Sequence, residues 1–514
     1  MLKKILAPIL AGVMVVGCLT ACGNSEPAVE EKSETVETSV VKDSEEVEEP
    51  KGDPTNLILF NVTNELAADH DLVWGKINEI LLEKLNVTVE YRNISWAEYK
   101  DKYPMIISSG EQVDILYCMN GTWQGYAEKG AFMDLTDLAP KYAPNLYGSL
   151  TEDQIVASTL HDKMWILPPH YIFTSINGVA VRGDLMDKYG IEDIITPSDF
   201  LEYLKVVYEN EEGFALFTDN NLNGQLQVVD AWQPVPSTEN LVWFDSSEGA
   251  DPSVLQFSWE HEKSIDKWKV LNEANEAGVM PKDAVMSEVS SQDAFVEGTM
   301  PAAAINSGNY SSAKVWGKIQ EEHPEWDPRW YYFYPEESRL ISPISNGWVI
   351  PATAKNPELS LQVMDLLAMD EELHDLVNYG IEGTHYVVNE KGELDLPEGK
   401  TAETKGYSGY GTIHVNEDYM KNTVGTWPEL NETVASYIEN GHISPLAGFS
   451  LDTSKISTEL ANMAAIWNEY NKSMHYGILP VDETIEEIKT AMEAAGCEKV
   501  REEVSAQIAA FLNK

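Results

Sequence analysis

Residues 57–91 read LILFNVTNELAADHDLVWGKINEILLEKLNVTVEY and carry the patterns of a strand, a helix and a second strand. The apolar run 57–60 predicts a short buried strand, and residues 87–91 alternate between apolar and polar positions as a second strand does. Between them, apolar residues recur at helical spacing: Leu72, Val73, Ile77, Ile80, Leu81 and Leu85. A helix that joins two short strands predicts a parallel βαβ unit and therefore the α/β class.

The same alternation of helix and strand patterns continues beyond this unit. Residues 96–107 predict another helix that ends at the segment Ser108-Ser109-Gly110, and residues 114–118 predict a further buried strand. Cys118 is therefore expected inside the core. From Thr55 onward the chain holds about 460 residues, enough for two or three domain-sized lobes.

The amino terminus has the pattern of an export signal. Two lysines precede the apolar run Ile5–Val16, which is too short to stay as a membrane-spanning helix but suits a signal peptide over residues 1–21. Cys18 and Cys22 both end segments that look like the bacterial lipobox, in which a lipid is attached to the cysteine thiol. We favour Cys22 because polar residues follow it at once; an ordinary secretory signal with incidental cysteines is the alternative. This hypothesis predicts a palmitate-carrying lipoprotein on the extracellular face of the cell membrane.

Residues 22–55 form the expected lipidated cysteine and the tether that follows it. Between Gly23 and Pro54 there are eleven acidic and three basic residues and no aromatic residue. Such a segment cannot bury enough apolar surface to offset the entropy of ordering it. We therefore predict a disordered, self-repelling linker.

The composition limits the classes of partner. The net charge of −50 argues against nucleic acid and anionic lipid surfaces and favours a neutral or cationic ligand. The 14 tryptophans and 23 tyrosines suit a protein that binds sugar rings, but aromatic residues also dominate ordinary cores, so both interpretations stay open. Beyond the signal region only Cys118 and Cys497 remain, too few for a disulfide framework.

Several short motifs stand in a fixed order along the chain. They are Ser109-Gly110-Glu111 with Asp114-Ile115, residues 130–136 (GAFMDLT) with Tyr142-Ala143-Pro144, residues 181–190 (VRGDLMDKYG), residues 295–300 (FVEGTM) and residues 355–358 (KNPE). Together they resemble the family 1 extracellular solute-binding proteins of bacterial ABC importers. Residues 379–386 (YGIEGTHY) and the ending 495–507 resemble the LipO-type lipoprotein branch, which has an extra C-terminal domain of unassigned function.

This resemblance implies a type II periplasmic-binding-protein fold. Such a fold has two lobes, each a mostly parallel sheet flanked by helices, and in this branch an α-rich C-terminal extension; the lobes close on a ligand by hinge motion. Lobe one is expected at residues 56–175 plus 342–375. Lobe two is expected at residues 176–341 plus 376–514 and includes the C-terminal domain.

The function implied by the resemblance is capture of a carbohydrate, most simply an oligosaccharide, in an interlobe cleft and its delivery to an ABC permease. The expected partners are the sugar, the transmembrane permease subunits and the membrane that holds the lipid anchor. The protein is expected to act as a monomer and to bind no nucleic acid.

Candidate ligand contacts lie in loops, because ligands of open α/β sheets bind beyond the carboxyl ends of strands. The resemblance adds the turn 306–310, where related sugar binders place an aromatic residue under the sugar. For every one of these residues a purely structural role in a loop or core is the alternative. The full set is Asn64, Glu65, Asn120, Trp123, Trp232, Asn309, Tyr310, Trp348, His385 and Trp427. Trp268 and Trp467 lie within helical patterns and are expected in the core.

Residues 219–230 follow the spacing of a calcium-binding loop. Oxygen ligands would come from Asp219, Asn221, Asn223 and Asp230, with a glycine at the sixth position. Two asparagines and a terminal Asp in place of a bidentate Glu predict weak binding at most. The alternative is an Asn/Gly turn, and no other cofactor is expected.

The sequence shows no sign of catalytic machinery. It contains no zinc-protease motif, no nucleophile elbow and no phosphate-binding loop, so no enzymatic activity is expected. A secreted glycoside hydrolase is the main enzymatic alternative, since a pair of catalytic carboxylates is defined by its separation in space rather than by sequence. A surface lipoprotein with an adhesin or signalling role is the other alternative.

Overall fold

The computed structural model describes residues 52–63, 65–119, 121–172, 174, 176–228, 231–336, 339–402, 404–409 and 414–513. All elements described below belong to the unit Gly52–Lys514. The signal peptide, Cys22 and the acidic segment up to residue 51 lie outside the described residues.

The βαβ unit predicted at the start of this chain segment is present. Strands β1 (Thr55–Val62) and β2 (Val87–Ile94) pair in parallel along their whole length, and helix α1 (His70–Leu85) joins them. The helix ends because Asn86 adopts a left-handed conformation, with φ of 55°, and its N–H donates to the carbonyls of Leu81 and Leu82. Asn tolerates this conformation better than most residues, so the turn into β2 follows at once.

Two further strands complete the first sheet. Strand β3 (Ile115–Met119) pairs in parallel with β1, and β13 (Asn346–Val349) pairs antiparallel with β3, which gives the order β13-β3-β1-β2. Cys118 lies in β3 and is fully buried, as predicted. The buried carboxylate of Asp114 accepts hydrogen bonds from the backbone N–H groups of Ile58 and Lys355, so it ties β1 to the segment after β13.

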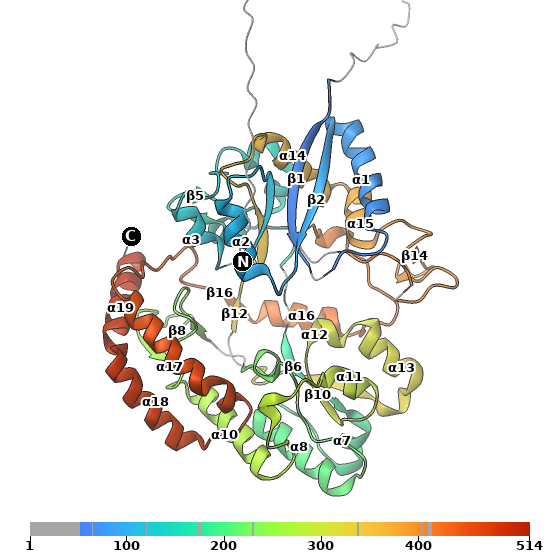
Figure 1. The fold of residues 1–514 in the computed structure, drawn as a ribbon. Coiled ribbons are helices and arrows are strands. Elements are labelled where there is room, and N and C mark those ends of the chain that lie inside the picture. Colours follow the sequence, from blue (N-terminus) through green and yellow to red (C-terminus); the bar gives the residue numbers. More distant parts are fainter. Residues whose placement is uncertain are drawn as a thin grey trace, which may run out of the picture. The chain divides into compact units, whose positions relative to one another are not determined.

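Helices cover the first sheet and share one hydrophobic core with it (Figure 1). A two-stranded antiparallel ribbon of β4 (Thr159–Leu160) and β5 (Lys163–Met164) adds to this part. The helices are α2 (Tyr99–Ser108), α3 (Trp123–Glu128), α4 (Ala139–Tyr142), α5 (Pro144–Ser149), α6 (Glu152–Ala157), α14 (Pro357–Met369) and α15 (Glu371–Tyr379).

The second sheet differs from the mostly parallel arrangement expected for it. Strands β10 (Ala302–Asn306) and β11 (Pro328–Tyr331) both pair antiparallel with the central strand β6 (Asn177–Arg182). Neighbouring strands of this sheet therefore run in opposite directions, whereas β1, β2 and β3 of the first sheet are parallel.

Two apolar clusters pack against this second sheet. The helices around it are α7 (Gly183–Tyr189), α8 (Pro197–Asn210), α11 (Ser291–Val296), α12 (Ser307–Tyr310) and α13 (Lys318–Glu322). Shorter helical turns here are η1 (Ala284–Met286), η2 (Ala313–Gly317) and η3 (Pro324–Trp326), while η4 (Glu417–Tyr419) lies against α15 of the first part.

A third sheet packs with the C-terminal helices. Its strands β7 (Trp232–Pro234), β8 (Val242–Asp245) and β9 (Leu255–Phe257) are antiparallel. One apolar cluster joins this sheet to the helices at the end of the chain, so the α-rich extension is part of the main body. The helices of this region are α9 (Leu222–Gln225), α10 (Glu262–Glu276), α17 (Ser457–His475), α18 (Val481–Ala495) and α19 (Cys497–Leu512).

The remaining elements lie between these regions. Strand β12 (Arg339–Ile341) pairs in parallel with β16 (Gly441–Ile443), and helix α16 (Leu430–Glu439) precedes β16. In Figure 1, α16 lies between the part that carries β1 and β2 and the part that carries β6 and β10. A small ribbon pairs β14 (Val387–Val388) with β15 (Leu394–Asp395).

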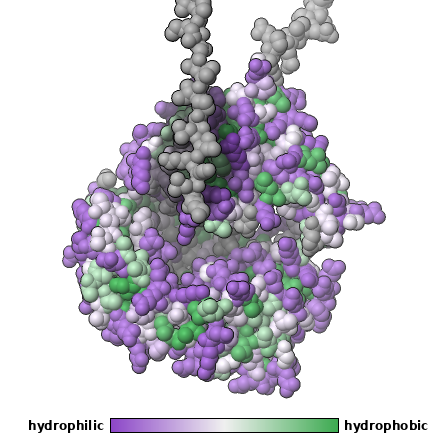
Figure 2. Space-filling model, viewed as in Figure 1, coloured by the Kyte–Doolittle hydropathy of each residue, from purple (hydrophilic) through white to green (hydrophobic). Residues whose placement is uncertain are grey.

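The face of the molecule shown in Figure 2 is largely hydrophilic. The face in Figure 2 shows mostly polar residues around a hollow at its centre, in keeping with the excess of acidic residues in the composition. Within the ranges that the structure describes, none of the helices has both the length and the apolar character that crossing a bilayer requires.

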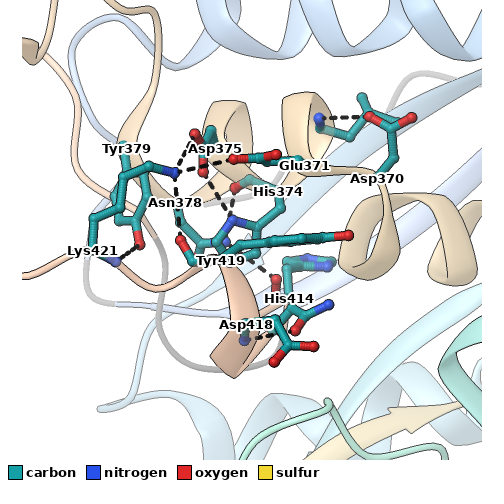
Figure 3. Close-up of polar contacts among 12 residues, drawn as sticks. Asp370, Glu371, His374, Asp375, Asn378, Tyr379, His414, Asp418, Tyr419 and Lys421 are labelled. Atoms are coloured by element: carbon teal, nitrogen blue, oxygen red, sulfur yellow. Dashed lines mark hydrogen bonds and ion pairs between the residues drawn. The ribbon is translucent and has the colours of Figure 1, made fainter. Parts of the chain in front are cut away.

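A polar cluster fastens residues 414–421 onto helix α15 (Figure 3). The two carboxylate oxygens of Asp375 lie 3.0 Å from His374 Nδ1 and 2.8 Å from Lys421 Nζ. Asn378 donates from its side-chain amide to the carbonyl of His414. Burial opposes ionisation of Asp375, but hydrogen bonds from His374 and Lys421 outweigh it and hold the pKa below its usual value.

The surroundings of His414 and His475 lower the pKa of both imidazoles well below the usual value. Both ring nitrogens of His414 are buried without a hydrogen-bond partner, and the ring packs 4.8 Å from that of Trp348. Burial, helped by the charge of nearby His374, lowers the pKa of His414 to about 3. Burial and then the charge of Lys267 lower the pKa of His475 to about 3 in the same way.

These two histidines predict a loss of stability in mild acid. In the unfolded chain each imidazole regains an ordinary pKa of about 6.5, so the unfolded state binds protons that the folded state does not. The stabilisation is complete above about pH 6.5, and each histidine removes roughly 1.4 kcal/mol of unfolding free energy per pH unit below that value. We expect urea unfolding at about pH 5.5 to show this loss relative to about pH 7.5.

The matched variant is His414→Phe, which keeps a ring beside Trp348 but cannot titrate. Its unfolding free energy should change less between the two pH values than that of the unmodified protein. An equal pH dependence in both proteins would show that His414 is not the origin of the effect.

Candidate functional site

An aromatic pocket of about 480 Å³ forms where the third sheet meets α10, α16 and α17. Such a volume accommodates a small ligand or one to two sugar rings. Its lining combines ring faces with polar groups: Asn223, Gly224, Gln227, Val228, Trp232, Gln233, Pro234, Asn240, Trp243, Ser258, His261, Ser264, Lys267, Trp268, Tyr437, Trp467, Asn471 and His475.

Neighbouring strands and the start of α10 build one aromatic wall. Trp232 lies on β7 and Trp243 on β8, where Trp243 pairs with Pro234. The His261 ring stacks on that of Trp243, with centroids 5.3 Å apart and planes 23° apart, and lies 6.5 Å from that of Trp232. Trp232, Trp243 and Tyr437 of α16 are all partly exposed, so their faces are open to a ligand.

Two long helices build the floor of the pocket. Trp268 on α10 lies 5.8 Å from Trp467 on α17 and 5.5 Å from His475 near the end of the same helix. Trp268 and Trp467 are 2% and 6% exposed, which confirms their expected place in the core. They also line the pocket, because this part of the core forms its inner surface.

The floor also carries polar groups. Lys267 on α10 is buried and its Nζ donates to the carbonyl of Leu226 at 3.0 Å. Burial lowers the pKa of Lys267 to about 8. The buried atoms Ser258 Oγ, Trp268 Nε1 and Asn471 Oδ1 have no hydrogen-bond partner. The pocket therefore offers hydrogen-bonding groups beneath ring faces, an arrangement that can fix a small polar ligand.

Of the ligand contacts predicted from sequence, Trp232 lines this pocket. Trp123, Tyr310 and Trp348 are instead almost fully buried, at 0%, 0% and 1% exposure. Trp123 and Trp348 belong to the core of the first sheet, whereas Tyr310 packs in another cluster and its hydroxyl donates to the carbonyl of Pro328. This burial fits the core role that was the alternative for each of them. A sugar contact by any of these three rings stays a prediction and requires another conformation.

The other predicted contacts are spread over the molecule. Trp427 is partly exposed and packs 5.3 Å from Tyr310, near the exposed Asn309. His385 is buried, accepts a hydrogen bond from the N–H of Ile381, and contributes to a groove of about 1090 Å³ away from the aromatic pocket. Glu65 is exposed just after β1. Asn64 and Asn120 lie outside the described residues, so these contacts remain predictions.

In the predicted calcium loop, the carboxylate of the first residue, Asp219, is hydrogen-bonded to other groups of the protein. One carboxylate oxygen of Asp219 accepts from the N–H of Asn221, and the other accepts from the N–H and hydroxyl of Ser291. Protein donors thus occupy both oxygens. Asn221 and Asn223 flank the start of α9, while Asp230 lies outside the described residues. Over the described ranges, no three or more His, Cys, Asp or Glu residues are grouped as a metal site. Calcium binding stays a hypothesis.

Sequence reasoning missed several pocket residues, namely Trp243, His261, Lys267 and Tyr437. A signal existed for Trp243, since the turn-forming residues 236–240 between it and Trp232 are typical of a hairpin connection. His261, Lys267 and Tyr437 give no such signal, because tertiary packing alone brings them to the pocket.

Comparison with known proteins gives a consistent picture. Residues 63–372 match the bacterial extracellular solute-binding protein family, and residues 445–513 match a domain of unknown function, DUF3502. A carbohydrate ABC transporter substrate-binding protein of Streptococcus pneumoniae serotype 4 (strain ATCC BAA-334 / TIGR4) is 26% identical over 458 residues, which cover 86% of this chain and 88% of that protein.

Solved structures share the fold. The N-glycan transport solute-binding protein NgtS of Streptococcus pneumoniae is similar with a TM-score of 0.75 and 22% identity, covering 90% of this chain and 99% of that one. The S. pneumoniae substrate-binding protein FusA, solved in complex with kestose, is similar with a TM-score of 0.59 and 16% identity, covering 90% and 100%. The fold is thus the two-lobed type II periplasmic-binding-protein fold, as predicted. By the match over residues 63–372, the chain belongs to the bacterial extracellular solute-binding proteins, a family of binding proteins for transport and not of enzymes.

Proposed function

We propose that this chain is the substrate-binding lipoprotein of an ABC importer and that it captures an oligosaccharide. Three findings support the proposal: the family assignment, the pneumococcal relative named as a carbohydrate ABC transporter substrate-binding protein, and the NgtS structures solved with Man1GlcNAc and Man5GlcNAc. These two glycans were bound to NgtS, and the sugar of this chain need not be the same.

The aromatic pocket is the observation that carries the proposal. Sugar rings present C–H groups on their faces and hydroxyls around their edges. The partly exposed faces of Trp232, Trp243 and Tyr437 suit the C–H side, and polar groups such as Asn240 and Ser264 suit the hydroxyls. An ordinary core would bury these rings completely.

Delivery to a permease follows from a population shift. In the proposed lobes, residues 56–175 plus 342–375 and residues 176–341 plus 376–514 move about the crossing segments. A sugar that contacts both lobes favours the closed form, which the permease subunits recognise. We propose that the protein does this as a monomer.

The proposed lipid anchor would raise the local concentration of the protein near the permease. A lipid on Cys22 would hold the protein at the extracellular face of the cell membrane, and the acidic residues that follow would act as a tether. Confinement near the permease raises the effective concentration of the loaded protein without any further contact.

From the lining of the pocket we predict which residues control the affinity for the oligosaccharide. Trp232→Ala and Trp243→Ala should each weaken binding of the oligosaccharide that most raises the melting temperature in a panel. Truncating a central aromatic contact typically costs about 2 kcal/mol, or roughly thirtyfold in affinity. The ligand-free melting temperature should change little, because both rings are partly exposed. Isothermal titration calorimetry measures the affinity.

The control for this pair is Trp96→Ala. Trp96 is 44% exposed and lies next to α2, outside the pocket lining, so its removal should leave the affinity unchanged. Unchanged binding by both pocket variants would exclude this pocket as the site. Conversion of the sugar into shorter products, abolished by changing one carboxylate, would contradict a transport role.

The anchor makes a separate prediction. Cys22→Ser should release the protein from the membrane fraction into the medium with its melting temperature intact, since the lipidated residue lies outside the folded unit. Cell fractionation measures the release, with Cys18→Ser as the matched control. Release of the Cys18 variant together with retention of the Cys22 variant would assign the lipid to Cys18.

A further inference from the structure

The inner end of the aromatic pocket contains a buried cation that has no counter-ion among the described residues. Lys267 is 5% exposed, and within the described part of the chain its Nζ makes one hydrogen bond, to the carbonyl of Leu226 at 3.0 Å. No carboxylate of the described residues pairs with it. An ammonium group has three N–H donors, so two of them remain for a ligand.

Other buried polar atoms around the same pocket also lack hydrogen-bond partners in the described structure. Ser258 Oγ, Trp268 Nε1 and Asn471 Oδ1 are buried without any hydrogen bond, and all three residues line the cavity that Lys267 lines. Buried polar atoms are almost always satisfied, because an unmet one costs free energy. Lys267 Nζ, Ser258 Oγ and Trp268 Nε1 can each donate a hydrogen bond, whereas Asn471 Oδ1 can only accept one, so a ligand with several acceptor oxygens and one hydroxyl would satisfy them.

The charge of the pocket is opposite to that of the protein. The chain has 85 acidic and 35 basic residues, yet the described pocket lining contains no Asp or Glu. Its titratable residues are His261, Lys267, Tyr437 and His475, and burial lowers the pKa of His475 to about 3. The local environment therefore favours an anion, although the net charge alone favours a neutral or cationic ligand.

A carboxylate fits these groups better than the alternatives. A sugar hydroxyl could accept a hydrogen bond from one of these donors. It is neutral, however, and would leave the buried positive charge of Lys267 uncompensated. A dianionic phosphate would bring two negative charges to a site with one cation. A carboxylate brings one negative charge and two oxygens that accept several hydrogen bonds.

We propose that the pocket binds a carboxylate-bearing sugar, such as a hexuronate residue of an oligosaccharide, with Lys267 as the counter-ion. The inference rests on the proposed function as a carbohydrate-binding protein and specifies the chemical class of the ligand. The ring walls hold the sugar face, while the carboxylate reaches the floor between α10 and α17.

The test compares matched sugars on the full exported chain. The probes are di- and trisaccharides that contain glucuronate or galacturonate, each paired with its carboxyl-reduced neutral counterpart. Acidic members should bind the unmodified protein about 10- to 100-fold more tightly than their neutral counterparts, the usual range for a charge-assisted hydrogen bond. Calorimetry gives the affinity and thermal melting gives the stability.

Two variants on helix α10 then test whether Lys267 causes the preference for the acidic sugar. Lys267→Met keeps the length of the side chain but removes the charge, so the ratio of acidic-sugar affinity to neutral-sugar affinity should fall to about one. Lys269→Met is the control, because Lys269 is exposed and pairs with Asp482 at 2.9 Å outside the pocket. It should keep the full preference.

The outcomes separate this inference from the proposed function. If neutral sugars bind as tightly as acidic ones, or if Lys267→Met weakens both equally, the carboxylate site is excluded and carbohydrate binding stands. If none of a broad oligosaccharide panel binds, the proposed function itself fails. Should Lys267→Met not fold, the comparison of paired sugars on the unmodified protein and on Lys267→Arg, which keeps the charge, still decides the question.

Discussion

The antiparallel pairing of β13 with β3 is the contact on which the two-part organisation depends. It places Trp348 opposite Tyr117 and Gly347 opposite Cys118, although the whole second sheet lies between them in sequence. A side chain at Gly347 would collide with Ile166 and with the carbonyl of Leu167, so only glycine allows this approach. The pairing of β13 with β3 brings together the two ends of the long segment that contains the second sheet. Bringing together the ends of a long segment costs little more conformational entropy than doing so for a moderate one.

The pocket depends in turn on the C-terminal helices. Trp467, Asn471 and His475 all come from α17, inside the residues that match the domain of unknown function. The apolar cluster that holds α17 to α10 and to the third sheet also fixes the distances among the pocket rings. The extension is therefore part of the candidate ligand site. A chain shortened before α17 would lose one wall of the pocket and much of the core beneath it.

Sequence periodicity was sufficient for local elements but not for the site. The strand, helix and strand at residues 57–91 follow directly from their apolar spacing, and Cys118 was placed correctly in a buried strand. The antiparallel second sheet could not be read locally, since strand direction depends on where the chain crosses between sheets. Trp232 was identified, yet its partners His261, Lys267 and Tyr437 come from separate helices and loops that only packing brings together. Trp123 and Tyr310 are buried in this structure, because an aromatic residue after a strand can equally turn into the core, so a sugar contact by either ring stays a prediction.

The acidic surface and the buried ammonium of Lys267 act over different distances in this protein. Solvent ions screen surface charges beyond about 8 Å at physiological salt, so the acidic exterior has limited influence on a group that is already inside the pocket. The ammonium of Lys267 is buried at the floor of the pocket, and it acts over hydrogen-bond distances where screening is weak. An acidic exterior therefore maintains solubility and slows the approach of anions, while the buried lysine determines which ligand stays. Selectivity in such an arrangement arises in the dissociation rate rather than in electrostatic steering, because the long-range field opposes the ligand that the short-range contact retains.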